Sequence, residues 1–318
     1  MQMCSLKWQK IMDKPHITLI GMGLIGSSIG HALKRGDLAS HITGYARSAT
    51  TREKALSIGF VDSIADSLQQ AVADADIVFL NVPVGMIADI VKDMAASLKP
   101  GAIVTDVGSV KKSVMDAVQA HLPENTTFVP AHPIAGTELS GPEAGFAELF
   151  DNRWCIITPD AETDKQAVKT VSDLWQAMGS DVEIMDADHH DLVLAITSHV
   201  PHLIAFNIVG TAADLEAVTQ SEVIKYSAGG FRDFTRIAAS DPVMWRDVFM
   251  NNGEAVLEML ARFSEDLTSL QRAIRWKDGE ALEKLFSHTR DIRRSIIEAG
   301  QDTGDVNFGR TESPHKTE

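Results

Sequence analysis

The sequence is poor in cysteine and in positive charge, and both shortages exclude classes of protein. Its 318 residues include two cysteines, Cys4 and Cys155, which lie far apart and outside any C-x-x-C pattern. This excludes a disulfide framework and a zinc ribbon. The formal net charge is −15, and no basic stripe offsets it. We therefore expect neither nucleic acid nor an anionic membrane surface as a partner. An acidic small substrate would need cations gathered locally.

Long apolar runs are also missing. No unbroken run reaches the ~18 residues that indicate a membrane span. Residues 1–15, MQMCSLKWQKIMDKP, lack the apolar core of a signal peptide. We therefore expect a cytoplasmic protein. The length corresponds to about two domains, and an apolar content of 44% is ample for a core.

A glycine-rich turn near the start of the chain organises the rest. The stretch ITLIGMGLIGSSIG, Ile17–Gly30, joins a short apolar run to a helix-compatible segment. Gly21, Gly23 and Gly26 form the pattern G-x-G-x-x-G. In a dinucleotide-binding unit the first glycine permits a tight turn, the second lets the backbone approach a pyrophosphate, and the third lets the helix pack on the strand. The phosphates lie at the helix N-terminus, so the pattern predicts a dinucleotide cofactor.

Strand-like and helix-like segments alternate up to about residue 182, which predicts an α/β fold with a doubly wound parallel sheet of the Rossmann type. Ligands of such sheets bind beyond the carboxyl ends of the strands. Asn81–Pro83, Val107–Ser109 and Ala131–Glu138 each follow a predicted strand, so we expect them to meet around the cofactor. The predicted strands are Ile17–Ile20, Ile42–Tyr45, Asp76–Val82, Ile103–Asp106, Phe128–Pro130, Trp154–Thr158 and Val182–Met185, and the predicted helices are Ser27–Lys34 (capped by Gly36), Ser63–Val72, Met86–Leu98 and Lys111–His121.

Beyond residue 182 the pattern is helical throughout. Ala187–Ala213 reads as one long helix with Pro201 inside it, and it is apolar nearly all round, which indicates burial, in part in a subunit interface. Gly229-Gly230 is a breaker, and Asp241-Pro242 begins a helix. We divide the chain into an N-terminal arm (1–14), a dinucleotide-binding domain (15–182), an all-helical substrate and dimerisation domain (183–300) and a disordered tail (301–318).

The end of the second predicted strand bears on the choice of cofactor. An Asp or Glu about 20 residues past the glycines would bind the ribose 2′-hydroxyl of NAD, but Ala46, Arg47 and Ser48 stand there. Arg47 beside hydroxyl groups suits the 2′-phosphate of NADP, although a solvated loop arginine gives the same pattern. We predict NADP in preference to NAD. The predicted cofactor contacts are Gly21, Gly23, Leu24, Ile25, Gly26, Arg47, Ser48, Val82, Pro83 and Ser109.

Three later segments carry groups capable of chemistry. The long glycine-rich segment Ala131–Phe146 contains His132, which could accept a proton from a substrate hydroxyl or be a structural histidine. Histidines and carboxylates gather between Asp188 and His202, but adjacent His189 and His190 point apart on a helix and no H-E-x-x-H occurs. We therefore predict no metal, and a buried, hydrogen-bonded role for His199.

The third segment, GGFRDFTRIAASDPVMWRD, spans Gly229–Asp247 and is dense in charged groups. Its spacing fits a salt-bridged helical face. It equally fits an anion clamp, in which an arginine gives two hydrogen bonds to a substrate carboxylate.

Together these motifs resemble the prephenate/arogenate dehydrogenase family of tyrosine biosynthesis, from about Ile17 to Phe286. The resemblance implies a Rossmann domain, a helical dimerisation domain that forms a homodimer, and no fused mutase or regulatory domain. It also implies NAD(P)-dependent oxidative decarboxylation of prephenate or arogenate to a phenol. The motifs that carry it are GMGLIGSSIG, DVGSVK (Asp106–Lys111), HPIAGTELSG from His132, SHVPH from Ser198, and Gly229–Asp247.

Matched by position, the resemblance implies that His132 is the base that holds the ring hydroxyl, with Ser109 assisting. It implies substrate contacts at His202 and at Arg236, which would bind a carboxylate. The residues implied to support that pocket are Asp233, Ser240 and Trp245.

Two other interpretations of the residues are open. Another Rossmann dehydrogenase, acting on a β-hydroxy acid, would use a lysine base, for which Lys225 is the candidate. A nucleotide-sensing protein would keep the fold without turnover. Retention of His132 and Arg236 argues against the second. Ala46, where many members of the family carry an acidic residue, leaves the choice between NAD and NADP open.

Overall fold

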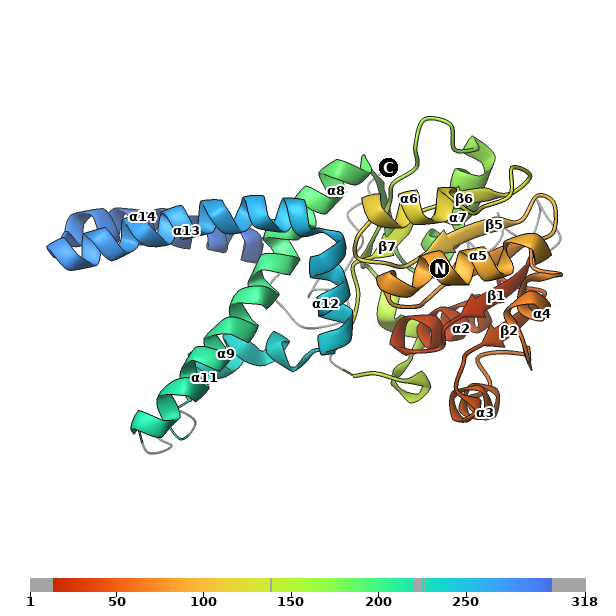
Figure 1. Cartoon of the computed structure of the whole chain (residues 1–318), viewed down its shortest axis with the longest axis horizontal. Helices are drawn as coiled ribbons and strands as arrows, with labels where there is room; N and C mark the ends of the chain where they lie inside the picture. Colours follow the sequence, from red (N-terminus) through yellow and green to blue (C-terminus); the bar gives the residue numbers. More distant parts are fainter. Residues whose placement is uncertain (1–13, 138, 220–224, 226, 299–318) are drawn as a thin grey trace.

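The computed structural model describes residues 14–137, 139–219, 225 and 227–298 (Figure 1). The predicted arm, apart from Lys14, and the predicted tail 301–318 lie outside the described residues. A Rossmann-type region occupies one end of the molecule in Figure 1, and long helices extend away from it at the other.

Six parallel strands form the central sheet, as the alternating pattern predicts. Their order is β3-β2-β1-β4-β5-β6, with β1 at the centre. Ile17 of β1 pairs with Ile42 of β2 on one side and with Ile77 of β4 on the other. The strands are β1 (His16–Ile20), β2 (His41–Tyr45), β3 (Ser63–Ile64), β4 (Ile77–Leu80), β5 (Ile103–Asp106) and β6 (Thr127–Val129).

Helices cover both faces of this sheet, so the predicted doubly wound architecture is confirmed. Ile17 and Leu19 of β1 lie in one apolar cluster with α2 and α7, and Ile20 lies in a second cluster with α4, α5 and α6. Successive side chains of a strand point to opposite faces, so one strand serves both clusters. The helices are α2 (Leu24–Gly36), α3 (Ala49–Ile58), α4 (Leu68–Val72), α5 (Ile87–Met94), α6 (Lys112–Gln119) and α7 (Lys165–Ala177), with short turns η1 (Val84–Met86) and η2 (Ala95–Ser97).

A second, three-stranded sheet contains segments that we expected in the parallel sheet. β7 (Ala131–Pro133) runs antiparallel to β8 (Trp154–Ile157), and β8 runs parallel to β9 (Asp181–Ile184). The expectation was wrong because strand patterns carry no information on which sheet a strand joins. His132 is therefore a strand residue, paired with Ile156, and not part of a loop. The irregular stretch after it contains η3 (Pro142–Ala144) and η4 (Ala147–Phe150).

Four local expectations also differ from the structure. The predicted helix Ser63–Val72 divides into β3 and α4, because Ser67 ends the extended segment and caps α4 through its hydroxyl. α3 and α7 were not predicted. Asp37 rather than Gly36 closes α2 in the left-handed conformation. Gly229-Gly230 begins a helix instead of breaking one.

Helices alone follow β9 in the described part of the chain. Near Pro201 the predicted long helix contains a π turn, because proline has no N–H to give and its ring excludes the regular turn before it. The elements are α8 (Ala187–Leu194), the π turn η5 (Ala195–His199), α9 (Val200–Thr219), α11 (Gly229–Thr235), η6 (Arg236–Ala239), α12 (Pro242–Asn251), α13 (Gly253–Trp276) and α14 (Gly279–Glu298).

The helical region leaves much apolar surface uncovered. α13 and α14 project away from the body (Figure 1), and Leu257, Ile274 and Trp276 of α13 are 66%, 64% and 71% exposed. The helix Ala187–Asp214 is long and apolar enough to cross a membrane by length and composition, with 28% of the relevant window buried. Our count of unbroken apolar runs missed it, because polar residues interrupt the run. An interface helix has the same composition, so this is weak evidence for a membrane.

Candidate active site

The glycine turn has the geometry that a dinucleotide requires. Gly21 has φ +91°, and a Cβ there would lie 2.2 Å from the Asn81 carbonyl oxygen, so this position requires glycine. A Cβ on Gly26 would lie 2.2 Å from the Gly21 oxygen, which keeps α2 close to the turn. Gly23 faces open space, with nothing within 4 Å of a Cβ. The backbone at Gly23 can therefore be approached by a pyrophosphate at the start of α2.

The other predicted cofactor positions lie at the same edge of the sheet. Leu24 and Ile25 open α2, and Val82 and Pro83 follow β4. Ser109 follows β5. Carboxyl ends of parallel strands meet at one edge, so these segments surround one space.

Arg47 and Ser48 follow β2 at this edge. Arg47 is exposed, with its guanidinium 3.7 Å from the Met86 sulfur, and Ser48 caps α3 by accepting from the Thr51 amide. Ser48 therefore has a structural role besides any contact with the cofactor.

His132 stands at the start of a chain of buried hydrogen bonds. Its Nδ1 lies 2.9 Å from His190 Nε2, and His190 Nδ1 lies 2.8 Å from Asp191 Oδ1. The Asp191 carboxylate also accepts the backbone amides of Lys111 and Lys112, at 2.8 and 3.0 Å. Residues of α8 thereby reach across to the start of α6 in the Rossmann region.

This chain fixes which nitrogen of His132 is free. An ionised carboxylate only accepts, so His190 Nδ1 carries the proton that bonds to Asp191. In a neutral imidazole His190 Nε2 is then an acceptor, and His132 Nδ1 donates to it. His132 Nε2 is left with a lone pair. It is the atom able to take a proton from a ligand.

Burial keeps these histidines neutral. Desolvation, followed by repulsion from His190, Lys111 and His199 when these are protonated, holds the pKa of His132 well below its usual 6.5. Desolvation also lowers the pKa of His190, although Asp191 opposes it. Burial by itself would raise the pKa of Asp191, but hydrogen bonds from His190 and the two backbone amides stabilise its charged form and together lower the pKa.

His199 is buried and hydrogen-bonded, as expected. Its Nδ1 accepts from the Asn252 amide at 3.0 Å, and the same amide nitrogen donates to the Asp191 carbonyl at 2.9 Å. Desolvation lowers the pKa of His199 to about 4, against a weaker opposing effect of Asp191. The backbone of Ser109 lies beside the ring. The π turn before Pro201 therefore places His199 between the Ser109 turn and the His132 chain.

His202, Trp245 and Arg236 gather on the helical side. The His202 ring stacks on Trp245 with centroids 3.7 Å apart, and its Nδ1 donates to the Ser198 carbonyl at 2.8 Å. The pKa of His202 is lowered by desolvation and by the nearby charge of Arg236. Trp245 in turn packs with Val110 from the turn after β5. The structure thus brings Ser109, His132, His202, Trp245 and Arg236 to one seam between the regions.

Two predicted pocket residues lie less centrally. Asp233 is exposed on α11 and pairs with its neighbour Arg232, so within one chain this carboxylate faces solvent. Ser240 ends η6 in extended conformation and is half-buried. Both stay predictions as pocket residues.

Sequence analysis missed the groups behind His132. His190, Asp191 and Asn252 had no assigned role. The one visible signal for His190 and Asp191 was the density of polar residues on an apolar helix, and Asn252, at the end of α12, carried none. His189 is exposed while His190 is buried, so the two point apart as expected. Lys225, the base of the alternative dehydrogenase interpretation, is exposed.

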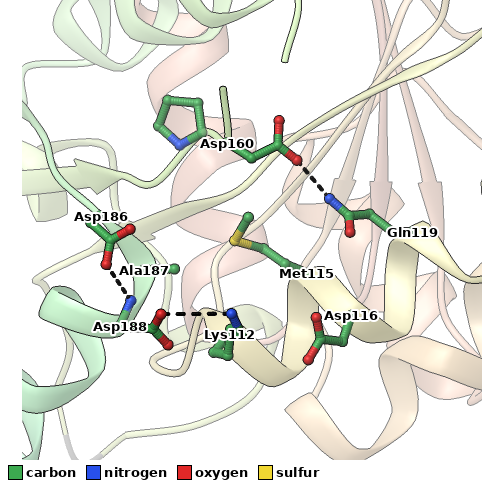
Figure 2. A pocket seen from close by; sticks show the side chains of 9 residues that line it. Lys112, Met115, Asp116, Gln119, Asp160, Asp186, Ala187 and Asp188 are labelled. Carbon is green, nitrogen blue, oxygen red and sulfur yellow. Dashed lines mark hydrogen bonds and ion pairs between the residues drawn. The ribbon is translucent and has the colours of Figure 1, made fainter. Parts of the chain in front are cut away.

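A surface pocket elsewhere on α6 is a poor site for an anion. Figure 2 shows Asp116, Asp160, Asp186 and Asp188 around it, with Lys112 paired to Asp188 at 3.6 Å. Four carboxylates would repel an acidic substrate. Among the described residues there is also no cluster of three or more His, Cys, Asp or Glu side chains able to hold a metal ion.

Comparison with known proteins gives one consistent result. Residues 29–184 match the family model of the prephenate dehydrogenase nucleotide-binding domain, and residues 186–288 match that of the prephenate dehydrogenase dimerization domain. The cyclohexadienyl dehydrogenase of Zymomonas mobilis is 42% identical over 281 residues, covering 88% of this chain and 96% of that protein. The prephenate dehydrogenase of Bacillus subtilis is 34% identical, covering 89% of this chain and 76% of that protein.

Among solved structures, prephenate dehydrogenase from Aquifex aeolicus in complex with hydroxyphenyl propionate and NAD+ has a TM-score of 0.83. It is 34% identical, and the match covers 91% of this chain and all of that one.

Proposed function

The chain belongs to the prephenate dehydrogenase family, and from this premise we propose that His132 Nε2 is the general base of its reaction. The protein is an NAD(P)-dependent oxidoreductase that catalyses the oxidative decarboxylation of prephenate or arogenate in tyrosine biosynthesis. The family assignment removes the β-hydroxy acid dehydrogenase and the nucleotide-sensing interpretations. The observation that carries the proposal is the hydrogen-bond chain from Asp191 through His190 to His132.

His132 accepts the proton of the ring hydroxyl. A bound nicotinamide supplies the hydride acceptor. His132 is neutral at working pH because burial lowers its pKa, and the Asp191 carboxylate stabilises the positive charge that the relay gains on proton transfer. Loss of carbon dioxide then makes the ring aromatic. Ser109, at the turn after β5, assists in holding the hydroxyl.

The helical region binds the rest of the substrate. Arg236 pairs with a carboxylate, since its planar guanidinium donates two hydrogen bonds and stays protonated. His202 and Trp245 form a stacked wall beside it. Asp233 and Ser240 complete the pocket. An anion entering a protein of net charge −15 needs this local cation.

We assign the cofactor as NADP in preference to NAD. Residues 15–182 form the dinucleotide-binding domain, with Arg47 at the end of β2 facing the 2′-phosphate. Two observations support this: Arg47 is exposed, and the position before it, Ala46, carries no carboxylate that would repel a phosphate. Initial rates with both substrates and both cofactors, followed by absorbance of the reduced nicotinamide, test the assignment. A higher kcat/KM with NAD would overturn it.

The cytoplasmic protein is a homodimer through the helical domain, residues 183–300. The uncovered apolar side chains of α13 and the weakly buried window of Ala187–Asp214 support this. Light scattering should give twice the chain mass of 34.5 kDa. Replacing Leu257 with Asp at its 66% exposed position should shift the protein toward monomer. A wild-type monomer at micromolar concentration contradicts the proposal.

A further inference from the structure

A buried ion pair lies behind the two residues assigned to catalysis. Asp106 ends β5, Lys111 lies five residues later, and both side chains are 0% exposed. Lysine is almost never fully buried unless it is paired. Replacing such a pair by apolar residues is often neutral or stabilising, so the pair by itself is weak evidence for a stability role. Its other contacts indicate what it does.

Every other hydrogen bond of these two side chains goes to the backbone beside Ser109 or His132. Asp106 Oδ1 accepts the Ala131 amide at 3.1 Å, and Lys111 Nζ donates to the Ala131 carbonyl at 2.7 Å. Asp106 Oδ2 accepts the Gly108 amide at 2.8 Å. Ala131, the residue before His132, is thus bound at both its N–H and its C=O. Gly108, the residue before Ser109, is bound at its N–H.

We propose that the Asp106–Lys111 pair is a positioning element that sets the place of Ser109 and His132 and keeps an ammonium group next to the His132 backbone. The proposal rests on His132 being the base of the proposed function. Neither residue touches the substrate. They act by fixing the backbone beside Ser109 and His132. The Lys111 ammonium also disfavours a positive charge on the nearby His132 imidazole.

Other charged groups face His132 as well. His190 and His199 approach from the helical region. Burial lowers the pKa of His132, and repulsion from His190, Lys111 and His199, when these are protonated, lowers it further. Asp191 acts through His190. The Cys155 thiol, in the neighbouring strand β8, has a pKa raised well above its usual value by burial and therefore carries no charge. Among the groups that disfavour a proton on His132, Lys111 is the one whose side chain binds the preceding residue, through the Ala131 carbonyl.

The test compares Lys111→Met with Lys169→Met in the full-length protein. Met keeps the length of the buried chain and removes the charge and the donor. In Lys111→Met we expect kcat to fall ~10–100-fold through misplacement of the base. The acid limb of the kcat profile should move up by about 1 pH unit, because the imidazole becomes easier to protonate. The KM for the cofactor should stay unchanged. Lys169, exposed on α7 and paired with Asp173, is the matched control, and its substitution should change neither kcat nor the acid limb.

If Lys111→Met does not fold, the same measurements are made on the double variant Asp106→Asn/Lys111→Met. Asn keeps an acceptor for the Ala131 amide and leaves no buried charge. This variant should keep the loss in kcat, since Met cannot hold the Ala131 carbonyl, with a smaller shift of the acid limb. The proposal would be overturned by folded variants that keep the wild-type kcat and the wild-type midpoint of the acid limb of the kcat profile. His132→Asn distinguishes failure of the proposed function from failure of this inference. If His132→Asn stays active, the assignment of His132 as the base fails. If His132→Asn is inactive while Lys111→Met has normal activity, only the positioning role of the ion pair fails.

Discussion

The two regions of the molecule differ in how completely they bury their own apolar surface. The parallel sheet has helices on both faces, and its central strands β1 and β4 are almost fully buried. In the helical region α14 buries no residue and α13 buries two, Val256 and Met259. The first region buries its core within one chain, whereas the second leaves apolar side chains exposed, on the face where we propose that the partner subunit packs. The residues proposed for chemistry lie where the two meet, so each region should affect a different kinetic quantity.

The largest effect should come from the Rossmann side of the seam. His132→Asn keeps a hydrogen-bonding side chain that cannot take the proton, so kcat should fall ~10²–10⁴-fold. Cofactor affinity should be retained, because the glycine turn is untouched. Steady-state rates and cofactor binding by fluorescence measure both. A variant within a few-fold of wild type would move the base elsewhere, with His202 the next candidate.

On the helical side, Arg236→Ala should weaken substrate binding and leave cofactor affinity alone. Arg236 is exposed in the single chain, so we expect the lower end of the range for a lost charge partner, ~2 kcal/mol or about thirtyfold in KM. Arg236→Lys should recover part of the loss, since it restores charge without the planar fork. Arg232→Ala, which removes an exposed arginine paired with Asp233, is the control. Normal substrate binding in Arg236→Ala would place the clamp at Arg232 or Arg246.

The seam itself should be sensitive to acid. The folded pKa of His199, about 4, lies below its ordinary value of 6.5, so the unfolded chain binds more protons between these values. The contribution of His199 to the free energy of unfolding is fully present above pH 6.5 and is lost as the pH falls toward 4. From pH 7 to pH 5 this amounts to ~2 kcal/mol of unfolding free energy.

Urea titrations at the two pH values measure this loss. His199→Gln, which removes the titrating group, should show a smaller decrease in stability than wild type. His189→Gln, at an exposed position on α8, is the matched control. Equal decreases in wild type and His199→Gln would assign the acid sensitivity to other groups.

The smallest effect should come from Arg47, which lies away from the seam. Arg47→Ala should raise the KM for NADP by about fivefold, since an exposed charged contact contributes ~1 kcal/mol. The KM for NAD and the KM for prephenate should stay near wild type. Equal effects on both cofactors would show that Arg47 does not contact the 2′-phosphate.

The sequence by itself determined the parallel sheet, the glycine turn and the helical second half. These follow from local patterns: buried strands are apolar runs, Gly21 requires positive φ, and Asp241 caps the helix that Pro242 begins. Motif resemblance also led to the family, because the motifs around His132, His202 and Arg236 occur in a specific order.

Only the tertiary structure decided what lies behind His132. His190 and Asp191 come from α8, far along the chain from β7, and nothing in their local pattern indicates that α8 crosses to the start of α6. The membership of β8 and β9 in a second sheet was hidden for the same reason. Periodicity reports which face of an element is apolar, but pairing between distant elements depends on how the whole chain packs. The hydrogen-bond chain that leaves His132 Nε2 free is therefore a property of the fold.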